Sequence, residues 1–206
     1  MEGGIRVNSF AFGGFLDPTL QGTVTNELVE IADWWSTFSL FGGADTTDDE
    51  AKAAGLPPPD SLDLRGLFVK GGNRTSPRET IFIGDSDSSD KVGNTIVAGV
   101  IRRDGWKLLY GKQSMAIWQG PVYPNSTVYP SGSLDCNAGC LFNIFDDPTE
   151  QNEVSKDHPQ IVRDLDALIK QEQQTVWNPD RGTGDDNLAC NVAFASHKGF
   201  MGPFLD

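Results

Sequence analysis

Short runs of β-branched and aromatic residues, separated by turn signals, dominate the second half of the chain. Four of these runs predict strands, at residues 79–85, 95–103, 106–111 and 140–145. Asp104 and Gly105 lie between the second and third runs. An Asp-Gly pair between apolar runs is typical of a type I′ hairpin turn, in which both central residues take a positive φ. The pattern therefore predicts an antiparallel sheet.

A helical period follows the predicted strands. Between residues 158 and 175 apolar residues recur at three- and four-residue spacings and define one face of a helix: Ile161, Leu165, Leu168 and Ile169. Pro159 lies near the first helical position, where its missing N–H is not needed. We expect this helix to cover one face of the four-stranded sheet, which gives a small α+β domain.

In the first half of the chain, the pattern predicts strands followed by a short helix, as in an α/β protein. GGIRVNSFAF (residues 3–12) and TVTNELVEI (residues 23–31) predict two strands, the first of them buried on at least one face. Asp33 is expected to be the N-cap of a short helix, DWWSTFSLF, which ends at Gly42 and Gly43. The next residues, 44–63, are acidic and then proline-rich, which predicts a surface loop.

Composition and charge narrow the classes of partner. The chain has 206 residues, of which 29 are acidic and 16 are Lys or Arg, so that its net charge is -13. We exclude a nucleic-acid partner, because Lys and Arg supply most of the affinity for phosphates. No apolar run approaches the roughly 18 residues that a membrane span needs. The first 30 residues contain no uninterrupted apolar stretch, so no signal peptide is expected in this chain.

The three cysteines suggest a disulfide rather than zinc. Cys136 and Cys140 lie in DCNAGC, close enough in sequence to form a small loop, provided that the chain between them turns tightly. Zinc needs four ligands, and the two histidines, His158 and His197, lie far from the cysteines in sequence. Cys190 is expected to be unpaired within this chain, which suggests a partner that the chain does not contain.

Motifs for catalysis or metal binding are incomplete. DSDSSD at residues 85–90 begins like a calcium loop, but the required Gly and Glu are replaced by Asp90 and Ile96. Residues 45–50 are interpreted as an exposed charge cluster or a helix N-terminus. The sequence contains no G-x-S-x-G motif and no phosphate-binding glycine loop. The residues themselves thus predict a fold but no catalytic or metal-binding residue.

Two N-glycosylation sequons fall in predicted loops. They begin at Asn73 and Asn125. Together with the cysteine pair, they favour a secretory route.

Five stretches in a fixed order carry a resemblance to a known family. They are EGGIRV at 2–7, ELVEIADWWSTF at 27–38, SPRETI at 76–81, IRRDGWKLLYG at 101–111 and LFNIFDDPTEQNEV at 141–154. The chain resembles type I sulfatases over nearly its whole length, and within them the branch similar to arylsulfatase B. Glu2 and Arg6 belong to the EGG-x-R motif, which in the family neighbours the site.

This resemblance implies a larger enzyme with an alkaline-phosphatase-like α/β domain and a small C-terminal domain. Residues 1–75 would be the end of the large domain, and residues 76–206 the small one. The family hydrolyses sulfate esters with a formylglycine and a calcium ion, whose residues precede the EGG-x-R motif. The resemblance thus implies that this segment alone is inactive and that sulfated small molecules or glycans are bound through the missing N-terminal domain. It also implies a secretory location, extracellular or lysosomal.

This segment departs from the family pattern at one position and carries three residues that the resemblance places near the substrate. Ser36 stands where the family usually has proline, which we expect to be harmless, because proline there only preorganises the first helical turn. The connection after the hairpin carries Lys112, Gln113 and Trp118, in a region that approaches the substrate in the family. The alternative is an ordinary surface loop with an aromatic residue over the sheet edge.

Three hypotheses remain open from the sequence. The chain is the C-terminal portion of a sulfatase, or a stand-alone non-catalytic module that binds a glycan or a protein, or a truncated product that hardly folds. A C/S-x-P-S-R motif upstream would favour the first. A cooperative melt of the 206 residues would favour the second over the third.

Overall fold

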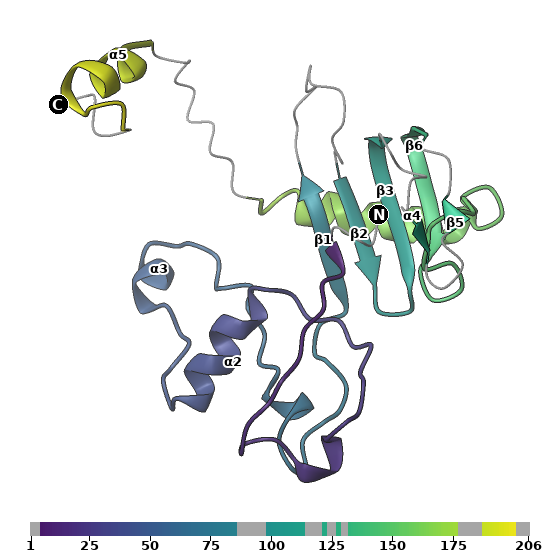
Figure 1. Cartoon of the computed structure of the whole chain (residues 1–206), viewed down its shortest axis with the longest axis horizontal. Coiled ribbons are helices and arrows are strands. Elements are labelled where there is room, and N and C mark those ends of the chain that lie inside the picture. Colours follow the sequence, from purple (N-terminus) through teal and green to yellow (C-terminus); the bar gives the residue numbers. More distant parts are fainter. Residues whose placement is uncertain are drawn as a thin grey trace. The chain divides into compact units, whose positions relative to one another are not determined.

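The computed structural model describes residues 5–85, 98–113, 121–122, 127–128, 132–176 and 187–200. The chain divides into two compact units, Met1–Thr175 and Val176–Asp206, which are described separately. Within the described part of the second unit lies one helix, α5 (Asn187–Ser196). All other described elements belong to the first unit (Figure 1). The expected division of the full enzyme after residue 75 stays a prediction.

A four-stranded antiparallel sheet forms the centre of the first unit. Its strands are β1 (Thr80–Asp85), β2 (Ala98–Arg102), β3 (Trp106–Gln113) and β6 (Leu134–Asn143), in the order β1-β2-β3-β6 (Figure 1). Each neighbouring pair is antiparallel. The predicted sheet is therefore confirmed, although β6 begins six residues earlier than the expected residue 140. A separate two-stranded ladder joins β4 (Pro121–Val122) and β5 (Thr127–Val128).

The hairpin between β2 and β3 differs from the predicted type I′ turn. Gly105 has φ 86°, whereas Asp104 is not among the described residues with positive φ. The Gly105 N–H donates to the Arg102 carbonyl at 2.9 Å, so the loop has three residues and ends in a left-handed glycine. Three-residue hairpins commonly place glycine at this position. The prediction of a hairpin was right, and the prediction of its turn type was wrong.

Both faces of the sheet are buried. Helix α4 (Pro159–Glu172) covers one face, and its Leu165 and Ile169 pack there against Val100 and Leu108. The opposite face has its own core of buried side chains: Ile83, Ile101, Leu109, Cys136, Cys140, Phe142 and Ile144. Leu28, from the first half of the chain, packs against this second core. The predicted helix over the sheet is thus confirmed, whereas the core on the second face was not predicted.

The first half contains helices but neither of the two predicted strands. Residues 5–12 and 23–30 form no strand, and Val7 and Val24 are 75% and 90% exposed. A strand requires a neighbouring strand to pair its N–H and C=O groups, and the described residues supply none here. Both strand predictions were therefore wrong for this chain. Only Leu28 of the second segment reaches a core.

Helix α2 (Asp33–Phe41) lies where the sequence predicts a helix and ends at Gly42, with Gly43 at φ 76°. Its N-cap is Ala32, which makes no side-chain capping bond. The prediction that Asp33 is the N-cap was wrong by one residue, because its carboxylate is used elsewhere.

Three short elements complete this half. They are the 3-10 turns η1 (Pro18–Leu20) and η2 (Arg65–Leu67) and the short helix α3 (Asp49–Ala53). Asp48 caps α3 by accepting from the Ala51 N–H at 2.8 Å, so the acidic run at 45–50 is a helix N-terminus, one of the two interpretations above. None of the described helices is long and apolar enough to cross a membrane.

Candidate functional site

The residues predicted to lie near substrate are only partly described. Lys112 and Gln113 belong to β3 rather than to a connection after the hairpin, because β3 continues to Gln113 and pairs there with β6. Gln113 is buried and its Nε2 donates to the Tyr110 carbonyl at 3.4 Å, whereas Lys112 is exposed opposite Asp135. The expectation of a loop was wrong for both residues. Trp118 lies outside the described residues.

The EGG-x-R motif is likewise described only at its end. Glu2 lies outside the described residues. Arg6 is exposed, and its guanidinium donates to Asn26 Oδ1 at 2.9 Å. Of the two sequons, Asn73 is exposed and Asn125 lies outside the described residues. No hydrogen bond or ion pair between described residues joins Arg6 or Asn73 to Lys112 or Gln113.

A cluster of charged side chains around Arg78 joins stretches that are far apart in sequence. Arg78 precedes β1, and Asp33 is the first residue of α2. The Arg78 Nε donates to Asp33 Oδ2 at 2.7 Å, and its Nη2 donates to Asp33 Oδ1. Glu30 forms a further ion pair with Arg78 at 2.8 Å, and the Asp60 carbonyl accepts from Nη2 at 2.9 Å. We call these residues, with those of the next paragraph, the Arg78 cluster.

A second arginine extends this cluster to the hairpin. Arg103 Nη2 donates to the backbone carbonyls of Ser76 and Arg78, and Nη1 pairs with Glu79 at 2.7 Å. The Ser76 N–H in turn donates to Glu27 Oε2 at 2.7 Å. Glu27, Ser76 and Arg103 come from three of the five stretches that carry the resemblance described above. These stretches therefore meet in one network of ion pairs and backbone hydrogen bonds.

Opposing effects set the pKa values in the Arg78 cluster. Burial acts to raise the pKa of Asp33, but the bidentate bond from Arg78 and the N–H groups of Glu30 and Leu62 outweigh it and lower that pKa. Burial raises the pKa of Glu30, and the nearby Arg78 offsets this only in part. The hydrogen bond to Asp33 raises the pKa of the Arg78 guanidinium. Asp33 is thus the carboxylate of the cluster whose lowered pKa favours the charged form.

The Arg78 cluster has the properties of a structural joint. Glu30 and Leu62 donate their N–H groups to the two Asp33 oxygens at 2.9 Å each, in addition to the two donors from Arg78. Four donors fill the roughly four lone-pair sites of a carboxylate, so Asp33 has no acceptor left for a substrate proton or a metal ion. Sequence reasoning missed this joint. One signal was the position of Arg78, a charged residue two positions before strand β1.

A second charged pair is buried on the sheet. Lys107 of β3 and Glu150 lie 2.7 Å apart, and their side chains are 1% and 2% exposed. Burial acts to raise the pKa of Glu150, but the Lys107 ammonium outweighs it and lowers that pKa. Glu150 has φ 55°, which an L-residue adopts only when its surroundings hold it there. The pair fixes the DPTE turn to the sheet.

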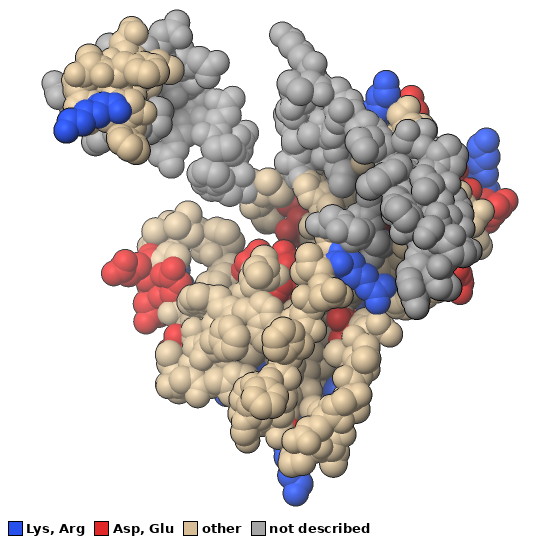
Figure 2. All heavy atoms as spheres, in the orientation of Figure 1, with Lys and Arg blue, Asp and Glu red and all other residues tan. Residues whose placement is uncertain are grey.

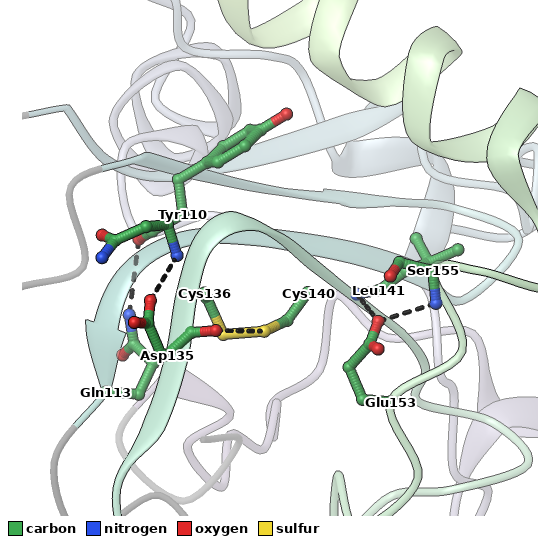
Figure 3. The surroundings of a disulfide bond; sticks show 9 residues. Tyr110, Gln113, Asp135, Cys136, Cys140, Leu141, Glu153 and Ser155 are labelled. Carbon is green, nitrogen blue, oxygen red and sulfur yellow. Dashed lines mark hydrogen bonds between the residues drawn. A yellow bond between two sulfur atoms is a disulfide. The ribbon is translucent and has the colours of Figure 1, made fainter.

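The predicted disulfide is present, in a different setting from the one expected. Cys136 and Cys140 are bonded, with their Cα atoms 5.0 Å apart, and both lie within β6 (Figure 3). Leu109 pairs with Cys140 and Gly111 with Cys136, so three residues of β6 stand opposite one residue of β3. The small loop that the bond closes is therefore a bulge within a strand. Gly139, at φ 90°, allows the bulge to pass close to Tyr110.

Two further observations concern possible ligands. Among the described residues no group of three or more His, Cys, Asp or Glu side chains is arranged to hold a metal ion. Cys190 on α5 is exposed and unbonded in the described part of the chain. The DSDSSD stretch that begins like a calcium loop lies, after Asp85, outside the described residues.

Comparison with known proteins gives a clear sequence match. No family model matches the chain. Arylsulfatase J of Mus musculus is 31% identical to it over 185 residues, which cover 84% of this chain and 30% of that protein. The chain thus spans less than a third of the length of the curated relative that it matches.

A solved structure is also similar, but only at a low level. It is described under the metabolism of multiple glycosaminoglycans by Bacteroides thetaiotaomicron, with the designation 6S-sulf. The TM-score is 0.43 at 20% identity, over 69% of this chain and 24% of that one. The sequence match to Arylsulfatase J, by contrast, covers most of this chain. The chain belongs to the sulfatase family and corresponds to a C-terminal portion of such a protein.

Proposed function

We propose that this chain is the C-terminal portion of an enzyme that hydrolyses sulfate esters, and that the chemistry is carried by the rest of that enzyme. The substrate would be a sulfated glycan or an aryl sulfate, with a specificity similar to that of arylsulfatase B. The observation that carries the proposal is the Arg78 cluster. The stretches shared with sulfatases meet there, and their charged groups are bonded to one another rather than directed at a ligand.

A calcium ion and a formylglycine belong to this proposal, but outside the described residues. The described carboxylates of the Arg78 cluster do not fit calcium, because Asp33 has both oxygens occupied by four N–H donors. Calcium needs six to eight oxygen ligands, which a carboxylate already bonded to a guanidinium does not readily supply. We derive no step of the reaction through this part of the chain.

Exposed apolar side chains support the idea that a further part of the enzyme covers this segment. Most of the large exposed apolar residues lie in the first 56 residues: Ile5, Val7, Phe10, Phe12, Phe15, Val24, Ile31, Trp35, Phe38, Phe41 and Leu56. Figure 2 shows a broad area with few charged side chains over this part. Exposed apolar surface of this extent marks an interaction site in soluble proteins. The occupant that we propose is the preceding catalytic portion of the sulfatase.

The disulfide and the two sequons support a secretory route for the whole enzyme. Disulfides form and persist in oxidising compartments, and the Cys136–Cys140 bond is buried in the sheet. A lysosomal or extracellular location follows from this proposal. It is tested by locating the full-length protein in its own cells.

The proposal is tested by activity. Residues 1–206 are assayed with a fluorogenic aryl sulfate in the presence of calcium, alone and in a chimera in which they replace the matching segment of mouse Arylsulfatase J. We expect no turnover from the chain alone and turnover from the chimera. Turnover by the chain alone that is lost on mutation of its own residues would overturn the proposal.

A variant of the chimera tests the covered surface. Trp35→Glu and Phe38→Glu place charges on side chains that are 51% and 61% exposed in this segment. We expect both variants to lower the melting temperature of the chimera more than that of the isolated chain. Phe145→Glu is the matched control, because Phe145 is 54% exposed but lies beyond β6, outside the apolar N-terminal part. Equal effects of all three would contradict the proposed contact.

A further inference from the structure

We propose that Asn73 is an N-glycan acceptor whose glycan covers a depression beside the Arg78 cluster. The tripeptide Asn73-Arg74-Thr75 has no proline at its middle position, as a sequon requires. Asn73 and Thr75 are both exposed. A secretory route is part of the function proposed above, but the acceptor itself can be tested without that function.

The backbone of the sequon already has a turn that suits glycan transfer. The Thr75 N–H donates to Asn73 Oδ1 at 3.1 Å, which makes an Asx turn. Such a turn brings residue i+2 beside the amide of residue i. Since the transfer reaction needs the hydroxyl of residue i+2 near the acceptor amide, the chain presents the two groups in the required order and close together.

The residue between them is held against the protein. Arg74 Nη1 donates to the Leu67 carbonyl at 3.0 Å, and Nη2 pairs with Asp17 at 2.6 Å. Asp17 is itself buried, and the Thr19 N–H and hydroxyl help to lower its pKa, so its charge is stable at neutral pH. Because Arg74 is bound inward, Asn73 and Thr75 are fixed on the solvent side.

Close backbone packing holds the sequon against a neighbouring turn. A Cβ on Gly66 would lie 3.0 Å from the Asn73 carbonyl oxygen, and a Cβ on Gly72 would lie 2.3 Å from the Gly66 carbonyl oxygen. The backbones of residues 66 and 72–73 are therefore in contact, while Asn73 itself remains exposed.

The surface around the sequon has room for the first sugar. A depression of about 160 Å³ opens there, with Asn73 and Thr75 among its lining residues. Its other lining residues are Asp63, Leu64, Gly66, Leu67 and Pro77. An N-glycan is bulky and solubilising, and lies on the protein surface. We infer that this depression stays in contact with solvent in the assembled sulfatase, so the catalytic portion docks elsewhere on the segment.

The experiment reads the modification directly. The chain is expressed behind a secretion signal in a eukaryotic host, and chymotryptic peptides, in which both sequons stay intact, are analysed by mass spectrometry after enzymatic deglycosylation in heavy-oxygen water. We expect the peptide with Asn73 to carry an Asp with the heavy label. Asn73→Gln and Thr75→Val should both abolish it, whereas Thr75→Ser should retain it. Thr75→Val is nearly isosteric and removes only the hydroxyl, so it separates the acceptor chemistry from the packing.

Several readouts keep the test decisive. The state of the Asn125 peptide, measured in the same digest, shows that the host's transferase reached the chain. Glycans are added inside the cell before the protein is exported. Protein retained in the cell can therefore be analysed in the same way if none is secreted. An unmodified Asn73 beside a modified Asn125, in protein that carries the Cys136–Cys140 bond, would overturn the proposal. Sulfatase activity is not used, so failure of the proposed function leaves this result unaffected.

Discussion

Asp33 and Arg78 lie 45 residues apart in sequence and form a buried, bidentate ion pair between the start of α2 and the residues before β1. The Asp33 side chain is fully buried, and that of Arg78 is 10% exposed. The pair ties the first half of the chain to the sheet. Because its groups are surrounded by further N–H and C=O partners, each charge depends on the other.

We expect removal of one partner to destabilise the chain strongly. Breaking a buried ion pair leaves an uncompensated charge and costs about 3–5 kcal/mol. Arg78→Lys removes the bidentate geometry and keeps the charge, so it should cost less than Arg78→Met, but more than a surface change. Urea unfolding measures the free energy of unfolding of each variant.

A surface pair supplies the control for this prediction. Arg65 and Asp63 form an ion pair at 2.9 Å, with side chains 38% and 41% exposed. Exposed pairs contribute little because solvent screens their charges, so Arg65→Met should have little effect on stability. Equal losses for Arg65→Met and Arg78→Met would contradict the assignment of Arg78 as the joint.

The Arg78 cluster also predicts how stability depends on acid pH. The pKa of Asp33 is lowered in the folded chain from its ordinary value of 3.8. Its contribution to stability is therefore present above pH 3.8 and is lost as the pH falls through the lower folded value. Asp33→Asn should flatten the loss of stability in this acid range, measured by melting temperature against pH.

Glu30 is predicted to act in the opposite sense. Its pKa is raised in the folded chain from 4.5, so the folded state favours the protonated form. The contribution of Glu30 is present below pH 4.5 and is lost as the pH rises through the raised folded value. Glu30→Gln should therefore raise the stability at neutral pH relative to pH 4. No change in this difference would contradict the pKa shift.

Features set by local sequence were predicted, and those set by distant contacts were not. The strands around Asp104 and Gly105 follow from alternation and a turn signal within a few residues. The Arg78 cluster depends on contacts between residues that are 18 to 49 positions apart, for which a single sequence gives no register. The strand expected at residues 3–12 needs a neighbouring strand, which the described residues do not contain. Its apolar pattern predicts a buried face, but the described residues contain no element that covers this face.

The disulfide predicts that one of the three cysteines has a free thiol. Cys136 and Cys140 are bonded and Cys190 is exposed, so labelling without reduction should modify Cys190 alone. Replacing both bonded cysteines by serine should cost about 2 kcal/mol, by the entropy of closing a loop of five residues. Non-reducing digestion and mass spectrometry identify the pairs. A bond from Cys190 to either partner would refute the pairing seen within β6.

The buried pair of Lys107 and Glu150 predicts strong coupling in a double-mutant cycle. Lys107→Met removes the ammonium that lies 2.7 Å from Glu150, whose side chain is 2% exposed, and should cost about 3–5 kcal/mol. Glu150→Gln removes the carboxylate that pairs with Lys107 and should cost a similar amount. With both changes the ion pair is gone from both sides, so the double variant should be more stable than the sum of the single losses predicts. Gln keeps the shape of Glu at φ 55°, so the backbone strain at position 150 is the same in all four proteins. Urea unfolding of the four proteins measures the coupling energy, and additive losses would show that the two charges do not depend on each other.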